Sequence, residues 1–246
     1  MELLETKGIT KSYDSREIIR DISIRLTEGE IVSLLGLSGS GKTTLLNIIS
    51  GLVRPDTGTV WLSGTDITGR PGFVSYMLQK DLLLEHKRVM ENVTLPLVIR
   101  GMKKEEAAKR ANVYFEQFGL SGRERMYPAQ LSGGMRQRAA LLRTYLASGG
   151  VVLLDEPFSA LDMITKGQMH RWYLDVAKKI GLSTLLITHD ADEAIMLSDR
   201  ICLLTGTPGE IRHEIRVPVP REDRKDFDLD PAFLKCKQEI REILRA

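Results

Sequence analysis

Alternating segments and short apolar runs dominate the first third of the chain. Residues 22–26 alternate between apolar and polar positions, and residues 31–35 form an almost continuous apolar run. Alternation predicts a strand with one solvent-facing side, whereas a continuous run of this length suits a parallel strand that is buried on both faces. A glycine-rich segment follows, and we expect residues 42–50 to form a helix that ends at Gly51.

In the middle of the chain, hydrophobic residues repeat with a different period. Residues 85–148 show a helical pattern, in which Ala108, Ala111, Phe115 and Phe118 are expected to share one buried face. Acidic and basic residues four positions apart lie on the opposite face, as they do on solvent-exposed helices. The middle therefore predicts a helical insert between two strand-containing segments.

A second helix of this insert is expected to begin after Ser132, which is a suitable N-cap residue. Strand patterns return at residues 151–154, 184–188 and 214–219, and residues 221–246 form a charged tail that closes with a short amphipathic helix. The pattern as a whole predicts an α/β core that a helical segment interrupts.

Composition excludes several classes of protein. The chain of 246 residues is 42% hydrophobic and 28% charged. It can therefore bury a sizeable core and is not intrinsically disordered. Its 35 lysines and arginines stand against 33 acidic residues, and the net charge of +2 gives no case for a nucleic-acid binder. The two cysteines, Cys202 and Cys236, have no metal-binding spacing and are expected to be reduced thiols.

No segment has the character of a membrane span. Residues 1–7 are mixed in charge and lack the apolar core of a signal peptide. No apolar run approaches the ~18 residues that a bilayer crossing needs. If the protein works in transport, another chain must span the membrane.

A phosphate-binding loop is predicted between the first buried strand and the helix that follows it. Residues 36–43 fit the pattern GxxxxGK[ST]. In such a loop, backbone N–H groups surround phosphate oxygens, Lys42 neutralises β/γ-phosphate charge and the Thr43 hydroxyl binds Mg²⁺. The expected nucleotide contacts are Gly36, Ser38, Gly39, Ser40, Gly41, Lys42, Thr43 and Thr44. The loop alone does not distinguish kinases, GTPases and ATPases, although the guanine-reading pattern NKxD is missing.

Two acids follow the apolar run at residues 151–154. In an open α/β sheet, ligands bind beyond the carboxyl ends of the strands, so Asp155 and Glu156 are expected beside the phosphate loop. Asp155 would hold Mg²⁺ directly or through water, and Glu156 would polarise the attacking water. The alternative, two solvated acids at a strand end, carries little weight beside a phosphate loop.

Residues 131–138, Leu-Ser-Gly-Gly-Met-Arg-Gln-Arg, resemble the signature motif of the ABC-type ATPases. Gln79 matches the Q-loop glutamine of that family, residues 159–162 match its D-loop, and His189 matches its switch histidine. Tyr13 stands where the family stacks an aromatic ring on adenine. These motifs occur in family order over nearly the whole chain, and their combination is highly specific.

The resemblance implies a fold with defined parts. It is that of a P-loop NTPase (RecA-like) α/β core with an N-terminal antiparallel β part and an inserted α-helical subdomain that carries the signature motif. One ABC ATPase domain would span residues 1–246, with its nucleotide-binding core at residues 1–84 and 149–220. The helical subdomain would comprise residues 85–148 and the tail helix residues 221–246.

The resemblance also implies a homodimer. Two copies would face head to tail, and Ser132, Gly133 and Gly134 of each would close on the ATP that the other copy holds. A complete hydrolytic site would therefore exist only in the dimer. Asp162 would lie at the seam and link the two sites.

Two further roles follow from the family motifs. His189 would contact the γ-phosphate and orient Glu156 and the attacking water. Gln79 would sense Mg²⁺ and water, and would report to the helical insert and a membrane partner.

Several segments resemble bacterial importers, among them residues 127–130 and 155–162. Residues 208–211 and 217–221 resemble the nitrate/sulfonate/taurine branch, which neighbours the thiamine-precursor importers. The resemblance therefore implies an energy-coupling ATPase on the cytoplasmic face of the membrane, with transmembrane permease subunits and, indirectly, an extracytoplasmic substrate-binding protein. Residues 84–87 depart from the Leu-Pro-Trp that this branch commonly has, which weakens any inference about the substrate.

Two alternative functions have less support in the residues. A soluble ABC ATPase that acts on DNA would insert a long coiled coil before the signature, yet the segment between Thr43 and Ser132 is too short for one, and the ribosome-acting relatives carry two ATPase domains. An inactive binding subunit is disfavoured because Lys42, Asp155 and Glu156 are present together with the switch histidine.

Overall fold

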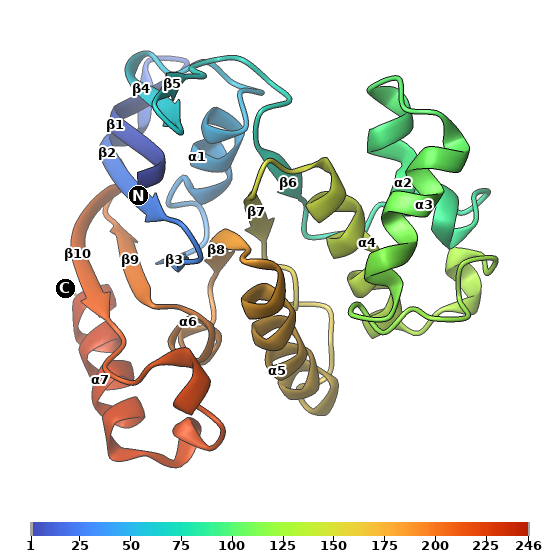
Figure 1. The fold of residues 1–246 in the computed structure, drawn as a ribbon. Helices are drawn as coiled ribbons and strands as arrows, with labels where there is room; N and C mark the ends of the chain where they lie inside the picture. Colours follow the sequence, from blue (N-terminus) through green and yellow to red (C-terminus); the bar gives the residue numbers. More distant parts are fainter. Residues whose placement is uncertain (1, 246) are drawn as a thin grey trace.

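The computed structural model describes residues 2–245, and a six-stranded sheet lies at the centre of its fold (Figure 1). The strand order is β10-β9-β3-β8-β7-β6, in which β10 is antiparallel and the other neighbours pair in parallel. The strands are β3 (Ile31–Gly36), β6 (Ser75–Met77), β7 (Val151–Asp155), β8 (Ser183–Thr188), β9 (Arg200–Thr205) and β10 (Glu210–Arg216). Every residue of β3 and β8 is buried, because both faces of a parallel sheet are covered.

A second, antiparallel sheet is built mainly from the N-terminal segment, in the order β2-β1-β4-β5. Its strands are β1 (Glu2–Tyr13), β2 (Arg16–Thr27), β4 (Thr57–Leu62) and β5 (Thr65–Asp66). Helix α1 (Lys42–Ile49) joins this sheet to the central one through an apolar cluster that includes Leu4, Ile22, Leu34, Leu45 and Leu46. The cluster fixes the position of the loop between β3 and α1.

The helical part comprises α2 (Val89–Ile99), α3 (Lys104–Phe115), a 3-10 turn (Pro128–Gln130) and α4 (Gly133–Ala147), and it extends to one side of the sheet (Figure 1). One expectation about its core was wrong. Ala107 is fully buried and Ala108 only partly, so the buried face of α3 runs through Ala107, Ala111 and Phe115. Ala111, Phe115 and Phe118 are buried as expected.

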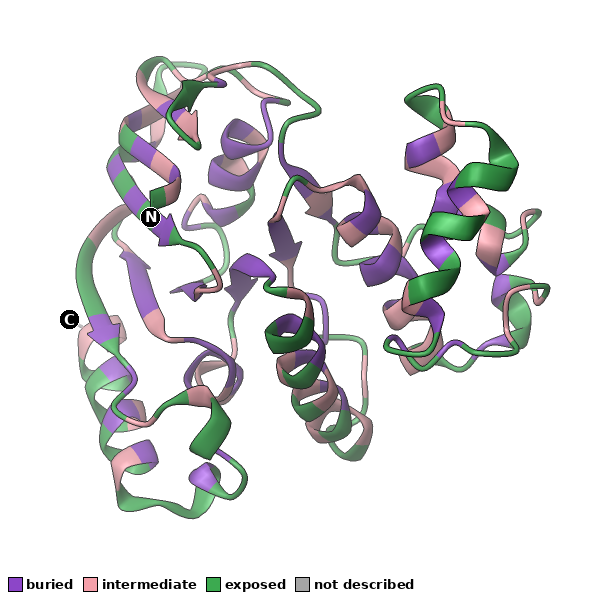
Figure 2. Cartoon of the chain, in the orientation of Figure 1, coloured by how far each residue is buried: buried purple, intermediate pink, exposed green. Residues whose placement is uncertain are grey.

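The remaining helices are α5 (Met163–Ile180), α6 (Ala191–Leu197) and α7 (Pro231–Arg245), with 3-10 turns at Arg221–Asp223 and Phe227–Leu229. The last strand was predicted too late along the chain. It spans Glu210–Arg216, and Pro218, which has no backbone N–H to donate, lies beyond its end. Purple, buried positions gather on the central strands and on the sheet-facing sides of the helices (Figure 2).

Two further expectations concern cysteines and membrane spans. Cys202 and Cys236 are both buried free thiols, and burial raises the pKa of Cys202 to about 12. Within residues 2–245, no helix combines the length and the apolar character needed to cross a membrane.

Candidate functional site

The loop between β3 and α1 is shaped by backbone conformations that only glycine tolerates. Gly41 has a φ of 97°, and a Cβ atom there would lie 2.3 Å from Cγ2 of Ile19. At Gly36 the carbonyl oxygen of Leu204 would lie 2.5 Å from an added Cβ. The loop backbone therefore packs closely against Ile19 and Leu204 just before the start of α1.

Lys42 is the cation of this loop. Its side chain is buried, and its ammonium group donates hydrogen bonds to the carbonyl oxygens of Gly36 (2.8 Å) and Leu37 (2.7 Å). Burial lowers the pKa of Lys42, and the nearby Glu156 and Asp155 carboxylates oppose that shift. A fixed, partly desolvated cation of this kind suits an anionic phosphate.

The loop opens on a cavity of about 580 Å³ that brings together residues of four predicted motifs: the phosphate loop, the Q-loop glutamine, the two acids and the switch histidine. Its lining consists of Ile18, Ser38, Gly39, Gly41, Lys42, Thr43, Thr44, Gln79, Asp155, Glu156 and His189. Beside it, the buried hydroxyl of Ser40 has no hydrogen-bond partner among the described residues. An unpartnered polar atom in a loop of backbone N–H groups fits a bound phosphate.

Asp155 lies at the carboxyl end of β7, half-buried beside the cavity. Burial raises the pKa of its carboxyl group, and the neighbouring Glu156 acts in the same direction, while Tyr76 and Lys42 oppose it. The Tyr76 hydroxyl donates a hydrogen bond to Oδ2 of Asp155 at 3.0 Å. Burial and the Asp155 carboxylate together raise the pKa of Tyr76, so the phenol keeps its proton.

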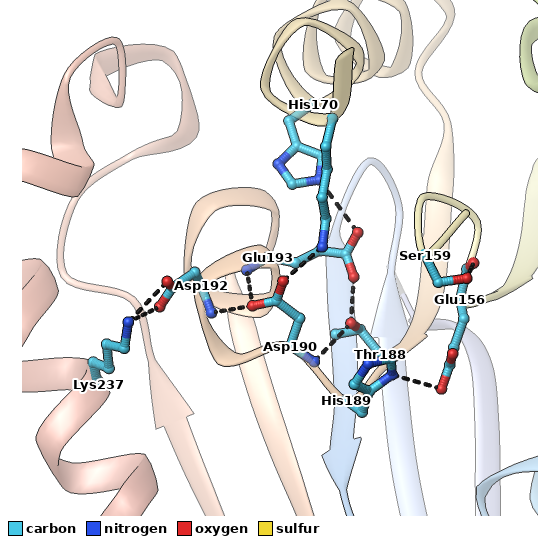
Figure 3. Close-up of polar contacts among 10 residues, drawn as sticks. Glu156, Ser159, His170, Thr188, His189, Asp190, Asp192, Glu193 and Lys237 are labelled. Atoms are coloured by element: carbon cyan, nitrogen blue, oxygen red, sulfur yellow. Dashed lines mark hydrogen bonds and ion pairs between the residues drawn. The ribbon is translucent and has the colours of Figure 1, made fainter. Parts of the chain in front are cut away.

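Glu156 is held in a strained backbone conformation, with a φ of 46°. Its N–H donates to the carbonyl of Ile187 at 2.9 Å, which ties it to the neighbouring strand β8. Its side chain lies between two others: Nδ1 of His189 is 2.9 Å from Oε1, and Nε2 of Gln79 donates to Oε2 at 3.2 Å. The contact with His189 is visible in Figure 3. Glu156, His189 and Gln79 thus converge on one point.

The residues on either side of His189 are anchored to two helices (Figure 3). The hydroxyl of Thr188 contacts the buried carboxylate of Glu193 and accepts a hydrogen bond from the Asp190 N–H at 3.0 Å. Asp190 also pairs with Lys166 of α5 at 2.6 Å and caps the N-terminus of α6. The backbone that carries His189 is therefore fixed against both helices.

Gln79 is linked to the helix that carries the signature motif. Asp81, which follows shortly after Gln79, accepts hydrogen bonds from the Arg136 guanidinium at 2.9 and 3.0 Å. Arg143 of the same helix donates to the carbonyl oxygens of Asp81 and Leu82. The segment after Gln79 thus lies against α4.

The other predicted site residues do not line the cavity. Ser132 caps α4, its Oγ accepting from the Met135 N–H at 3.4 Å, and Gly133 and Gly134 form the first turn of that helix. Asp162 caps α5, and the exposed Tyr13 has the Lys11 ammonium over its ring. In a single copy of the chain, the phosphate loop and the signature loop are separate features.

Oxygen ligands for a divalent cation are present but few. Thr43 and Asp155 both line the cavity. Residues 2–245 hold no group of three or more histidine, cysteine, aspartate or glutamate side chains arranged for a metal. Mg²⁺ in phosphate-transfer sites is typically bound by one or two protein oxygens together with substrate phosphates and water, so this donor set fits Mg²⁺.

Sequence reasoning missed three residues of the site. Ile18 lines the cavity, and Ser159, although part of the D-loop match, was given no role, yet its Oγ lies 3.3 Å from Nε2 of Gln79. Tyr76 contacts Asp155 from the adjacent strand. A tyrosine shortly before Gln79 was the available signal, but only the pairing of β6 with β7 brings it beside Asp155.

Comparisons with known proteins show which family the chain resembles. Residues 19–159 match the family model described as ABC transporter. The chain is 42% identical to the formylaminopyrimidine import ATP-binding protein of Halalkalibacterium halodurans, over 99% of this chain and 96% of the relative. It is 35% identical to the nitrate import ATP-binding protein of Synechocystis, over 92% of this chain and 88% of that one.

Solved structures give the same result for the fold. A dimeric ATP-binding cassette in a post-hydrolysis state with ADP and Pi superposes with a TM-score of 0.74 at 29% identity, over 89% of this chain and all of that one. The predicted fold class is confirmed. The chain belongs to the ABC transporter family, as an ATP-hydrolysing, energy-coupling cassette of the importer type.

Proposed function

We propose that the 580 Å³ cavity binds Mg-ATP and that Glu156 is the general base of its hydrolysis. The convergence of Glu156, His189 and Gln79 carries this proposal, because a carboxylate held by two side chains is oriented before a water arrives. The phosphates would lie against the N–H groups of residues 38–44, with Lys42 as counter-charge. Thr43 and Asp155 would hold Mg²⁺, which when bound neutralises charge on the phosphate oxygens.

The proton movement follows from the contacts of Glu156. Its carboxylate accepts a proton from the attacking water, and the 2.9 Å contact with His189 keeps the carboxylate in place while it does so. His189 would also contact the γ-phosphate and so align it with the water. Gln79 contacts both Glu156 and Ser159 and is placed to respond to a change in either.

A second copy of the chain would complete the site. The N-terminus of α4, at Ser132, Gly133 and Gly134, offers backbone N–H groups and a helix dipole to an anion. These residues lie outside the cavity of their own chain, so they are available to the γ-phosphate held by a partner. Asp162 at the start of α5 would lie at the seam, and Tyr13 would stack on adenine.

The expected partners are transmembrane permease subunits, and through them an extracytoplasmic substrate-binding protein, with the ATPase on the cytoplasmic face of the membrane. The two relatives import a formylaminopyrimidine and nitrate, according to their names. We infer a small solute of the thiamine-precursor type or of the nitrate/sulfonate/taurine type. A net charge of +2 gives no support to a nucleic-acid partner.

A pull-down tests the partners. The tagged chain is purified from native membranes in mild detergent and the co-purifying proteins are identified, with the Lys42→Ala variant as a matched bait. Recovery of a multi-spanning permease together with a substrate-binding protein supports the proposal. Recovery of ribosomal or DNA-repair proteins without a membrane protein contradicts it. The solute then follows from ligand screening of the captured binding protein.

A further inference from the structure

Tyr76 occupies a position that the proposed reaction leaves without a role. It is the central residue of β6, the edge strand of the central sheet, and it pairs with Leu153 of the parallel strand β7. Its ring packs against the apolar cluster beneath α1 and is half-buried. The ring is therefore fixed by its neighbours, while its hydroxyl reaches the end of β7.

The hydroxyl meets the carboxylate proposed to hold Mg²⁺. It donates to Oδ2 of Asp155 at 3.0 Å, and no other hydrogen bond reaches that carboxylate from residues 2–245. A phenol is protonated at neutral pH and donates a single hydrogen bond. One carboxylate oxygen is thus committed to Tyr76, and the other keeps its full capacity to accept a cation or a cation-bound water.

This arrangement decides how the carboxylate is oriented. The side chain of an aspartate turns freely about its terminal bond unless a partner restrains it. Ligating carboxylates are themselves typically hydrogen-bonded by outer partners, which orient them and raise metal affinity. We propose that Tyr76 is the positioning residue of the Mg²⁺ site, holding the Asp155 carboxylate in its binding orientation before the cation arrives.

The proposal rests on the proposed role of Asp155 and makes a separate prediction. Replacing Tyr76 by phenylalanine removes the hydroxyl and keeps the ring in its apolar surroundings. Loss of an outer partner typically weakens metal binding by about tenfold or more. The substitution should weaken the affinity for the cation. The affinity for nucleotide measured without a cation should stay unchanged, because Tyr76 does not line the cavity.

The experiment titrates Mn²⁺, as a paramagnetic stand-in for Mg²⁺, into the full chain saturated with a non-hydrolysable ATP analogue. Electron paramagnetic resonance reports free Mn²⁺ without any turnover. We expect the dissociation constant to rise about tenfold in Tyr76→Phe. In ATPase assays the Mg²⁺ concentration for half-maximal rate should rise by the same factor, whereas kcat at saturating Mg²⁺ should stay close to that of the unmodified chain.

The matched control is Tyr145→Phe, which removes a hydroxyl that contacts Tyr114 in the helical part at 3.4 Å. It should leave Mn²⁺ binding unchanged. Equal Mn²⁺ affinities in Tyr76→Phe and the unmodified chain overturn the positioning role of Tyr76. Failure of the unmodified chain itself to bind Mn²⁺ with nucleotide overturns the proposed metal site instead.

A second measurement tests the proposal if the phenylalanine variant does not fold. 3-Fluorotyrosine placed at position 76 retains the hydroxyl, and its ¹⁹F signal is followed as Mn²⁺ and the ATP analogue are added. Strong paramagnetic broadening at position 76, with none at a fluorotyrosine in position 145, supports the proposal. An unbroadened signal at position 76 contradicts it.

Discussion

The phosphate-loop region and the signature region resemble each other chemically but differ in what surrounds them. Each presents the N-terminus of a helix, α1 at Lys42 and α4 at Gly133, to solvent-accessible space. Around α1, a buried cation, two carboxylates and a histidine meet in one cavity. Ser132, Gly133 and Gly134 do not line that cavity, and the Ser132 side chain caps its own helix. In a single copy, charged groups therefore gather around the phosphate loop, whereas the proposed function assigns the start of α4 to the site of a second copy.

The two regions are connected within the chain by the segment after Gln79. Arg136 and Arg143 of α4 bind this segment, and Gln79 itself contacts Glu156. A displacement of α4 relative to the sheet would therefore act on the contacts of Glu156. Three kinds of variant test how the two regions differ: those that remove the proposed general base, those that damage the two loops on different chains, and those that disrupt the contacts between the regions.

The largest effect is expected for Glu156→Gln. A general base typically contributes about 10² to 10⁴ in rate, so kcat should fall by that factor while ATP binding persists. The neutral amide also removes a negative charge beside the phosphates, so a closed dimer should accumulate on a sizing column in Mg-ATP. Glu105→Gln on the exposed face of α3 is the matched control and should behave like the unmodified chain. A Glu156→Gln chain with normal turnover would falsify the role of the base.

The next largest effects are expected for two variants that damage the phosphate loop and the signature loop separately. Lys42→Ala removes the buried cation and should weaken nucleotide binding roughly ten- to a hundredfold, the usual range for a charge-assisted contact. Gly134→Asp places an anion at the start of α4, where an added Cβ meets only Met169 and Thr165 at ordinary contact distances of 3.6 and 3.7 Å. Each variant alone should hydrolyse little ATP, since every dimer site would contain one damaged half.

Mixing these two variants should restore activity. A mixed head-to-tail dimer has one site with an intact phosphate loop from one chain and an intact signature loop from the other. Random pairing of equal amounts should give about a quarter of the unmodified rate. Gly134→Ala controls for volume without charge and should retain activity. Absence of recovery in the mixture would show that the two loops of one chain act together.

Much of the α/β part could be predicted because its signals are local. The strand at residues 31–35, the loop at residues 36–43 and the acids after residue 154 each have a direct physical reason in adjacent sequence. Tyr76 was not predicted from the sequence, because its role depends on the pairing of two strands from distant parts of the chain. In that pairing Tyr76 lies opposite Leu153. The contacts of Arg136 and Arg143 were not predicted for the same reason: each joins α4 to residues 81–82, which precede the helical segment and are distant in the sequence.

The connection between the regions is tested by Arg136→Met. The guanidinium binds the partly buried Asp81 carboxylate and also Glu85. Because the pair is only partly shielded from solvent, its loss should lower the free energy of unfolding by about 1 kcal/mol at pH 7. Burial raises the pKa of Asp81, but the hydrogen bonds from Arg136 outweigh it, and the pKa lies below its ordinary value. The contribution is therefore complete above the ordinary aspartate pKa of about 3.9 and is lost as pH falls through the lowered pKa.

Denaturant unfolding across a pH series measures this contribution. The gap between the unmodified chain and Arg136→Met should be constant from pH 7 to about pH 5 and should close below about pH 4. Arg171→Met, on an exposed position of α5, is the control. It should leave the free energy of unfolding within about 0.5 kcal/mol of the unmodified value. A gap that persists unchanged in acid would assign the stabilisation to packing of the arginine stem instead of its charge.

The smallest effect on stability and activity is expected for Lys237→Met in α7. Lys237 is connected to His189 only indirectly, through a series of contacts. Its ammonium donates to Asp192 at 2.8 Å, and Asp192 lies in the first turn of α6, which Asp190 caps (Figure 3). Both partners are substantially exposed. The free energy of unfolding should therefore fall by no more than about 0.5 kcal/mol at low salt, with unchanged ATPase activity and no difference at high salt, because salt screens such exposed pairs.

Lys235→Met on the exposed side of the same helix is the control for this variant. The buried contacts of Thr188 and the ion pair of Asp190 with Lys166 already hold the backbone of His189 without the tail. A large loss of ATPase activity in Lys237→Met alone would contradict that account, since it would mean that α7 fixes α6 and, through α6, the position of the histidine beside Glu156.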